Sequence, residues 1–97
     1  MRVSLVRSGG FAGLQRTAAV DGAALPQAER GELEALVAGA GFFALPPTLP
    51  APAPDRFRYR LTVEDDAGRA HTVVVDEAAM PERLRALIAW VEGRGRG

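Results

Sequence analysis

The stretch Arg56-Phe57-Arg58-Tyr59-Arg60-Leu61-Thr62-Val63-Glu64 alternates between polar and apolar side chains along its whole length. Its aromatic and aliphatic residues occupy every second position, which is the period of a strand with one buried face. Antiparallel sheets that pack one face on a core and leave the other in water have this pattern. The alternation therefore predicts a strand over residues 56–64, with Tyr59 facing a core and a row of arginines facing solvent.

The residues that follow this strand predict a hairpin and then a helix. Asp65–Arg69 has the composition of a turn, and Ala70–Val75 is a β-branched partner strand. Met80-Pro81 then leads into a helix, because proline is well tolerated where a helix begins. Apolar residues at helical spacing give this helix one buried stripe, formed by Leu84, Leu87, Ile88 and Val91.

The N-terminal half repeats the same order of elements. We expect a strand over Arg2–Arg7, a glycine-rich turn over Ser8–Gly13 and a return strand over Leu14–Val20. Pro26 suits the first position of the helix that follows. The helix has the apolar stripe Leu33, Leu36, Val37 and Ala40, and Gly39 and Gly41 are suited to end it.

An internal match supports the division into two halves. Thr17–Pro26 aligns with Thr72–Pro81 at a constant shift of 55 residues. Two interpretations are open: two similar half-sites, or the same strand-to-helix turn used twice in an alanine-rich chain. Either way the predicted fold class is α+β with element order ββαββα, two helices packing on one face of a four-stranded, mainly antiparallel sheet. We expect a single domain over residues 1–97, with a Pro-rich linker over 44–55 between the halves.

Composition excludes several classes of function. The chain has 97 residues, with twelve basic residues, all arginine, and twelve acidic ones, so its formal net charge is zero. A neutral domain lacks the positive field that non-specific binding to nucleic acid or to anionic membranes needs. The absence of cysteine excludes disulfides and thiol chemistry. With no apolar run of membrane-spanning length and no signal-peptide pattern, we expect a cytoplasmic protein without a cofactor.

The residues that could carry chemistry do not assemble into a catalytic or metal-binding set. His71 is the only histidine, and its same-face neighbours in a strand are valines, so we expect a structural or surface role. The acids Glu64-Asp65-Asp66 lack the spacing of a calcium loop and fit a solvated turn. The arginines that alternate with aromatics would point away from them into solvent, which argues against base stacking, and contact of the arginine row with an acidic protein surface stays open. We therefore assign no catalytic or metal-binding residue and expect no enzymatic activity.

The hairpin tip is the least ordinary segment of the sequence. It comprises six residues: Ser8, Gly9, Gly10, Phe11, Ala12 and Gly13. Unlike a phosphate-binding loop it is expected to join two strands, and no Lys-Ser or Lys-Thr follows it. Phe11 is a large apolar side chain at an exposed position, which is unfavourable unless it folds back over the hairpin or meets a partner. Glycines on both sides keep the tip narrow, so that it could enter a deep groove.

Several segments together resemble the emfourin family. They are Arg7–Gly13, with its Ser-Gly-Gly-Phe tip, the Phe42–Pro46 segment, the strand from Asp55 to Val63 and the helix from Met80 to Trp90. The resemblance covers nearly the whole chain in the same order, whereas the Pro-rich stretch is the part least expected to be shared. Emfourins are known as small bacterial protealysin inhibitors that act on thermolysin-like zinc metallopeptidases.

The resemblance implies helices on an antiparallel sheet and reversible inhibition of a thermolysin-like peptidase through its active-site cleft. Such peptidases cleave before large apolar residues, so we expect the Ser8–Gly13 tip to enter the cleft with Phe11 in the primed-side pocket. Contact with the catalytic zinc by a backbone carbonyl or by Ser8 stays open. We expect a monomer when the protein is free. The alternative function is a non-enzymatic interaction module that uses the same tip on a different partner.

Overall fold

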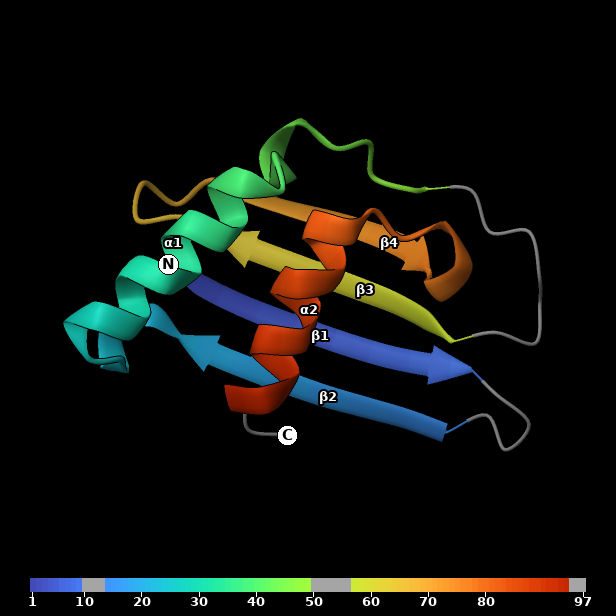
Figure 1. Cartoon of the computed structure of the whole chain (residues 1–97), viewed down its shortest axis with the longest axis horizontal. Coiled ribbons are helices and arrows are strands. Elements are labelled where there is room, and N and C mark those ends of the chain that lie inside the picture. The colour runs from blue at the N-terminus through green and yellow to red at the C-terminus, as the bar shows by residue number, and fades with distance from the viewer. Residues whose placement is uncertain (10–13, 50–56, 95–97) are drawn as a thin grey trace.

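Four strands form one sheet in the computed structural model, which describes residues 1–9, 14–49 and 57–94 (Figure 1). The strands are β1 (Arg2–Gly9), β2 (Leu14–Asp21), β3 (Arg58–Glu64) and β4 (Ala70–Asp76). Their spatial order is β2-β1-β3-β4, and each neighbouring pair is antiparallel. The predicted hairpin-helix-hairpin-helix arrangement is confirmed, and the central pair is formed by the first strand of each half.

Two helices cover the same face of this sheet, α1 (Gln27–Gly39) and α2 (Glu82–Arg94) (Figure 1). Short 3₁₀ turns precede each of them, η1 (Gly22–Ala24) and η3 (Glu77–Ala79), and a third turn, η2 (Phe42–Ala44), follows α1. None of the helices in the part of the chain that the structure describes is long and apolar enough to cross a membrane. The α+β class and the placement of both helices on one face agree with the sequence prediction.

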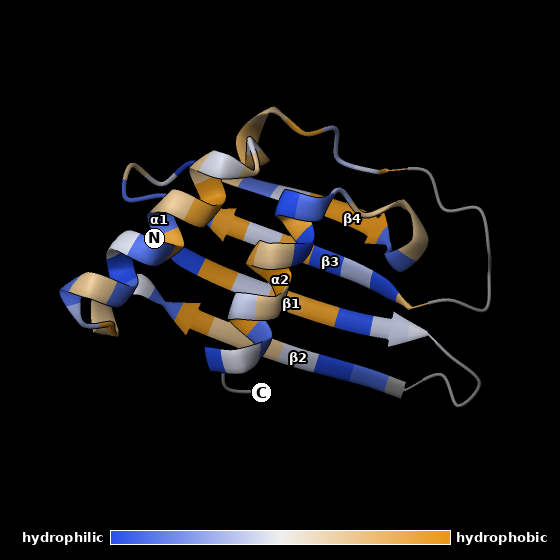
Figure 2. Ribbon diagram, viewed as in Figure 1, coloured by the Kyte–Doolittle hydropathy of each residue, from blue (hydrophilic) through white to orange (hydrophobic). Residues whose placement is uncertain are grey.

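The alternation in β3 decides which face the helices cover. Tyr59, Leu61 and Val63 are buried against the helices, whereas Arg58 and Arg60 are exposed on the uncovered face. Figure 2 shows the same alternation of hydrophobic and hydrophilic positions along the strands. The strand was predicted from Arg56, whereas β3 begins at Arg58; Phe57 precedes it, and Arg56 lies outside the described residues.

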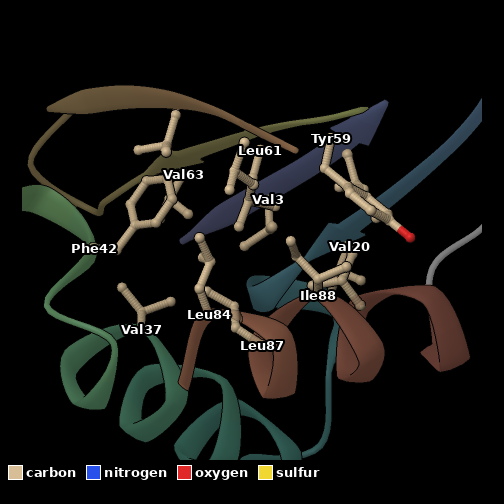
Figure 3. Packing of buried hydrophobic residues seen from close by; sticks show 14 of the residues in the cluster. Val3, Val20, Val37, Phe42, Tyr59, Leu61, Val63, Leu84, Leu87 and Ile88 are labelled. Carbon is tan, nitrogen blue, oxygen red and sulfur yellow. The ribbon is translucent and has the colours of Figure 1, made fainter. Parts of the chain in front are cut away.

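One continuous core joins the two halves (Figure 3). Leu84, Leu87 and Ile88 of α2 point toward the sheet, while Phe42 closes the core beyond the end of α1. Burying a side chain of this size stabilises the fold by about 1.5–3 kcal/mol relative to exposure. The buried apolar residues are Val3, Leu5, Val20, Leu33, Val37, Phe42, Tyr59, Leu61, Val63, Val73, Val75, Met80, Leu84, Leu87, Ile88 and Val91.

The internal match corresponds to the same local structure in both halves. The elements η1 and η3 begin 55 residues apart, and so do α1 and α2, each of which has 13 residues. Asp21 accepts a hydrogen bond from the backbone N–H of Ala23, and Asp76 accepts the equivalent bond from Ala78. The repeated sequence therefore encodes a repeated strand-to-helix turn.

Each helix begins one residue after its proline, whereas Pro26 was predicted to be the first helical residue. Pro26 stands one position before α1 rather than within it, and its carbonyl accepts from the N–H of Arg30 at 3.0 Å. Pro81 has the same place before α2, where its carbonyl accepts from Arg85. After α1 the chain turns at Gly41, whose φ of 58° lies in the left-handed region that glycine adopts most easily.

The described part of the Pro-rich segment lies along the outer edge of β4. Val74 donates its N–H to the carbonyl of Pro47, and Leu49 donates to the carbonyl of Val74, so Thr48 forms a parallel bridge. This contact covers backbone groups that an edge strand otherwise leaves open. The rest of the predicted linker, residues 50–55, lies outside the described residues.

Candidate functional site

The strands that lead to the Ser8–Gly13 tip are paired up to their last residues. Gly9 lies opposite Leu14 in the register, and Ser8 lies between Gln15 on β2 and Arg58 on β3. Gly9 has a φ of 114°, a backbone conformation that L side chains rarely adopt. The predicted site residues Gly10, Phe11, Ala12 and Gly13 lie outside the described residues.

β1, which leads into the tip, has a hydrogen-bonded neighbouring strand on each side. β1 pairs with β2 along one edge and with β3 along the other. On the helix-bearing face, Arg7 lies with its guanidinium 5.0 Å from the ring centre of Phe57 and 3.2 Å from the carboxylate of Glu92. The base of the tip is therefore fixed to β3, to α2 and to the residue preceding β3.

The second hairpin turn, Asp65–Arg69, lies at the opposite end of the sheet (Figure 1). This follows from the topology, because β1 and β3 are antiparallel and each turn follows the C-terminal end of its strand. The carboxylate of Asp65 accepts from the N–H groups of Ala67 and Arg69 within the turn. The two tips therefore cannot contact the same small surface.

The acids of this second turn have local partners. Asp65 also forms an ion pair with Arg69 at 3.3 Å, and the guanidinium of Arg69 lies 4.4 Å from the ring centre of Phe43. The amino group of Met1 beside Asp66 holds the pKa of that carboxyl below its usual value. Within residues 1–9, 14–49 and 57–94, no group of three His, Cys, Asp or Glu side chains is placed to hold a metal ion.

His71 has the structural role that its apolar neighbours predict. Its Nε2 lies 2.7 Å from the carbonyl oxygen of Leu45, which identifies this nitrogen as the hydrogen-bond donor. The ring packs edge-on against Phe42, with 5.5 Å between ring centres, and close to Phe43. The imidazole thus fastens the chain after α1 to β4, at the end of the sheet away from the Ser8–Gly13 tip.

Comparison with known families gives a match over most of the chain. The emfourin family model matches residues 5–92 of the 97 residues. The chain belongs to the emfourin family. No curated protein and no solved structure matched it.

Emfourins form a protease-inhibitor family, so this membership suggests inhibition of a metallopeptidase and implies a protease as the partner. The matched region of this emfourin begins within β1 and ends within α2. It contains the whole predicted tip and both halves of the repeat. The resemblance inferred from the sequence is therefore confirmed at the level of the family.

Sequence reasoning missed the positions of two arginines near the tip. Arg7 and Arg16 lie opposite each other in the β1–β2 register, on the helix-bearing face. With Leu5, Thr17, Ala18 and Glu92 they line a hollow of about 180 Å³ beside α2. Leu5 and Arg7 occupy every second position of β1, so the alternation alone could have placed Arg7 on the same face as the buried Leu5. The position of Arg7 next to Tyr59 of β3 depends on the strand order, which the alternation does not determine.

Proposed function

We propose that this emfourin inhibits a thermolysin-like zinc metallopeptidase reversibly, by inserting the Ser8–Gly13 tip into the active-site cleft of the enzyme. The observation that carries the proposal is the continuous pairing of β1 with β2 up to Gly9 and Leu14. Four residues then join two strands that are already fixed next to each other. A segment held in this way loses less conformational entropy on binding than a free peptide, which favours affinity.

Phe11 is the proposed anchor in the primed-side pocket. Thermolysin-like enzymes accept a large apolar side chain there, and Gly10-Phe11 has the form of a bond that they cleave. Efficient cleavage needs the scissile carbonyl to reach a near-attack geometry. A tip whose two ends are held by paired strands resists that adjustment, so the chain would act as an inhibitor rather than as a substrate.

The experiment is titration of the protein against a panel of zinc, serine and cysteine peptidases that includes thermolysin. Inhibition restricted to the thermolysin-like enzymes supports the proposal. Inhibition of none of them contradicts it and favours the alternative, an interaction module that presents the same tip to another partner.

The role of Phe11 is tested with Phe11→Ala and a matched truncation, Phe43→Ala. Phe43 is half-buried at the far end of the molecule, beside Arg69. Loss of a pocket-filling anchor raises the inhibition constant by about 30-fold or more, since such anchors contribute about 2 kcal/mol or more. The Phe43→Ala protein should inhibit like the native chain, provided that circular dichroism finds it folded. Equal inhibition by both variants would exclude Phe11 as the anchor.

A further inference from the structure

Four arginines surround the base of the tip. Measured along the strands, they occupy three consecutive rows of the sheet: Arg58 is opposite Ser8, Arg16 is opposite Arg7, and Arg60 is opposite Val6. Neighbouring strands lie about 4.8 Å apart and successive residues about 3.4 Å apart, so these four Cα atoms fall within a small area. We call Arg7, Arg16, Arg58 and Arg60 the basic band.

The basic band occupies both faces of the sheet. Arg58 and Arg60 are exposed on the open face, where they line a hollow of about 80 Å³ together with Val6, Ser8, Gln15 and Val74. Arg7 and Arg16 lie on the helix-bearing face, beside the hollow next to α2. A tip inserted into a cleft would thus carry positive charge toward both walls of the cleft mouth.

Most of this charge is not neutralised by the residues that the structure describes. Among the described residues, Arg7 is the one member of the band with an ion-pair partner, Glu92. The acid nearest to Arg58 in the register is Asp76, which is 1% exposed and whose carboxylate accepts from the N–H of Ala78. Glu77 is half-buried and accepts from the N–H of Phe57. These acids are engaged with the backbone, so within residues 1–9, 14–49 and 57–94 no carboxylate forms an ion pair with Arg16, Arg58 or Arg60.

At the end of the sheet away from the tip, the uncovered face is acidic rather than basic. There the single arginine of the strands, Arg2, lies between Asp21 on β2 and Glu64 on β3. The acidic turn residues Asp65 and Asp66 follow directly after Glu64. The formal net charge of zero therefore conceals a separation of charge along the sheet, with a cluster of arginines at the end where the tip emerges.

We propose that the basic band docks on an acidic surface that borders the active-site cleft of the inhibited peptidase. This inference rests on the proposed function and specifies the chemistry of its partner. Guanidinium groups match carboxylates in a bidentate geometry, and complementary charges around a binding site accelerate association more than they strengthen the final complex. The band thus guides the tip to the cleft and sets its orientation there.

The test compares two triple variants with the same net charge. The band variant replaces Arg16, Arg58 and Arg60 with glutamine. The control variant replaces Arg2, Arg30 and Arg83, three arginines outside the band, with glutamine. Association rate constants with thermolysin are measured from progress curves of inhibition at low and high ionic strength, about 10 mM and about 1 M, where the screening length falls from about 30 Å to about 3 Å.

At low ionic strength the band variant should associate about 10-fold more slowly than the native protein, and the control within about 2-fold of it. At high ionic strength all three proteins should converge. If the association rates of both triple variants fell equally, net charge rather than the position of the arginines would matter. If the association rate of the band variant did not change, the band would make no contact with the peptidase. Either result overturns the inference. Both results leave the proposed function intact if Phe11→Ala still raises the inhibition constant as expected above. Absence of inhibition by the native chain across the whole panel overturns both proposals.

Discussion

The guanidinium of Arg7 and the carboxylate of Glu92 form an ion pair at 3.2 Å, which connects the last turns of α2 to the strand that leads into the tip. The two side chains are 26% and 35% exposed, so water screens much of their attraction. Arg7 also lies over the ring of Phe57, which holds its position independently of Glu92. The pair therefore affects the charge of the basic band more than the stability of the fold.

Replacing Glu92 with glutamine should increase the rate of association with the peptidase. The substitution removes the carboxylate that neutralises Arg7 and so adds one unpaired cation to the band. We expect an association rate about 2-fold higher at low ionic strength, because steering by complementary charge raises association rates. The free energy of unfolding should fall by less than about 1 kcal/mol, as is usual for exposed ion pairs.

Glu34→Gln is the control for this change. Glu34 is exposed on α1 beside Val37 and Phe43, away from the basic band, and the substitution changes the net charge by the same amount. Rates measured side by side at low and high ionic strength separate the two positions. Faster association of both variants to the same extent would contradict a local role for Glu92.

A side chain at Gly9 should strain the base of the tip. Gly9 has a φ of 114°, and an alanine in such a region costs about 1–3 kcal/mol. We expect Gly9→Ala to lower the free energy of unfolding by about that amount and to weaken inhibition, since the strand pairing that fixes the tip ends at this residue. Urea unfolding and the inhibition constant measure the two effects.

Gly31→Ala is the same chemical change, but we expect it to raise the free energy of unfolding rather than to lower it. Gly31 lies in the middle of α1, and a Cβ placed there meets no other atom within 4 Å. Alanine favours the helix over glycine by about 0.5–1 kcal/mol, so this variant should be more stable and inhibit normally. If Gly9→Ala were as stable as Gly31→Ala, the backbone at Gly9 would not be strained by a side chain.

The sequence was most informative where the pattern depends on local geometry. The alternation around Tyr59 predicted which face of β3 is buried, and the stripe from Leu84 to Val91 predicted the buried face of α2. The first helix was predicted less well: Leu33 and Val37 are buried, but Leu36 and Ala40 are only half-buried. The reason is that α1 lies over one end of the sheet, so less of its surface meets the core (Figure 1).

The strand order could not be predicted, and the candidate site depends on it. The period of each strand fixes its faces but not its neighbours, so the proximity of Arg58 to Ser8 became evident only from the pairing of β1 with β3. The same pairing separates the two hairpin turns, which the sequence left open. The family resemblance predicted a partner, whereas the distribution of charge around the tip required the three-dimensional arrangement.

The duplicated turn allows one interaction to be compared in two environments. Asp21 and Asp76 each accept a hydrogen bond from the backbone N–H two residues later, at 3.0 Å and 2.7 Å. Asp21 is exposed, whereas Asp76 is 1% exposed. Removing an exposed cap costs about 1 kcal/mol, because water replaces the lost acceptor. The bond from the N–H of Ala78 to Asp76 is part-buried, so water replaces the lost acceptor less completely, which costs up to about 1–3 kcal/mol more.

Asp76→Ala should therefore destabilise the protein clearly more than Asp21→Ala in urea unfolding experiments. Asp76→Asn retains a side-chain oxygen that accepts from the N–H of Ala78 and should recover part of the loss. None of the three changes touches the tip, so each folded variant should inhibit the peptidase with a constant within about 2-fold of the native one. Equal destabilisation by Asp76→Ala and Asp21→Ala would contradict this expectation, because it would mean that burial does not strengthen the cap.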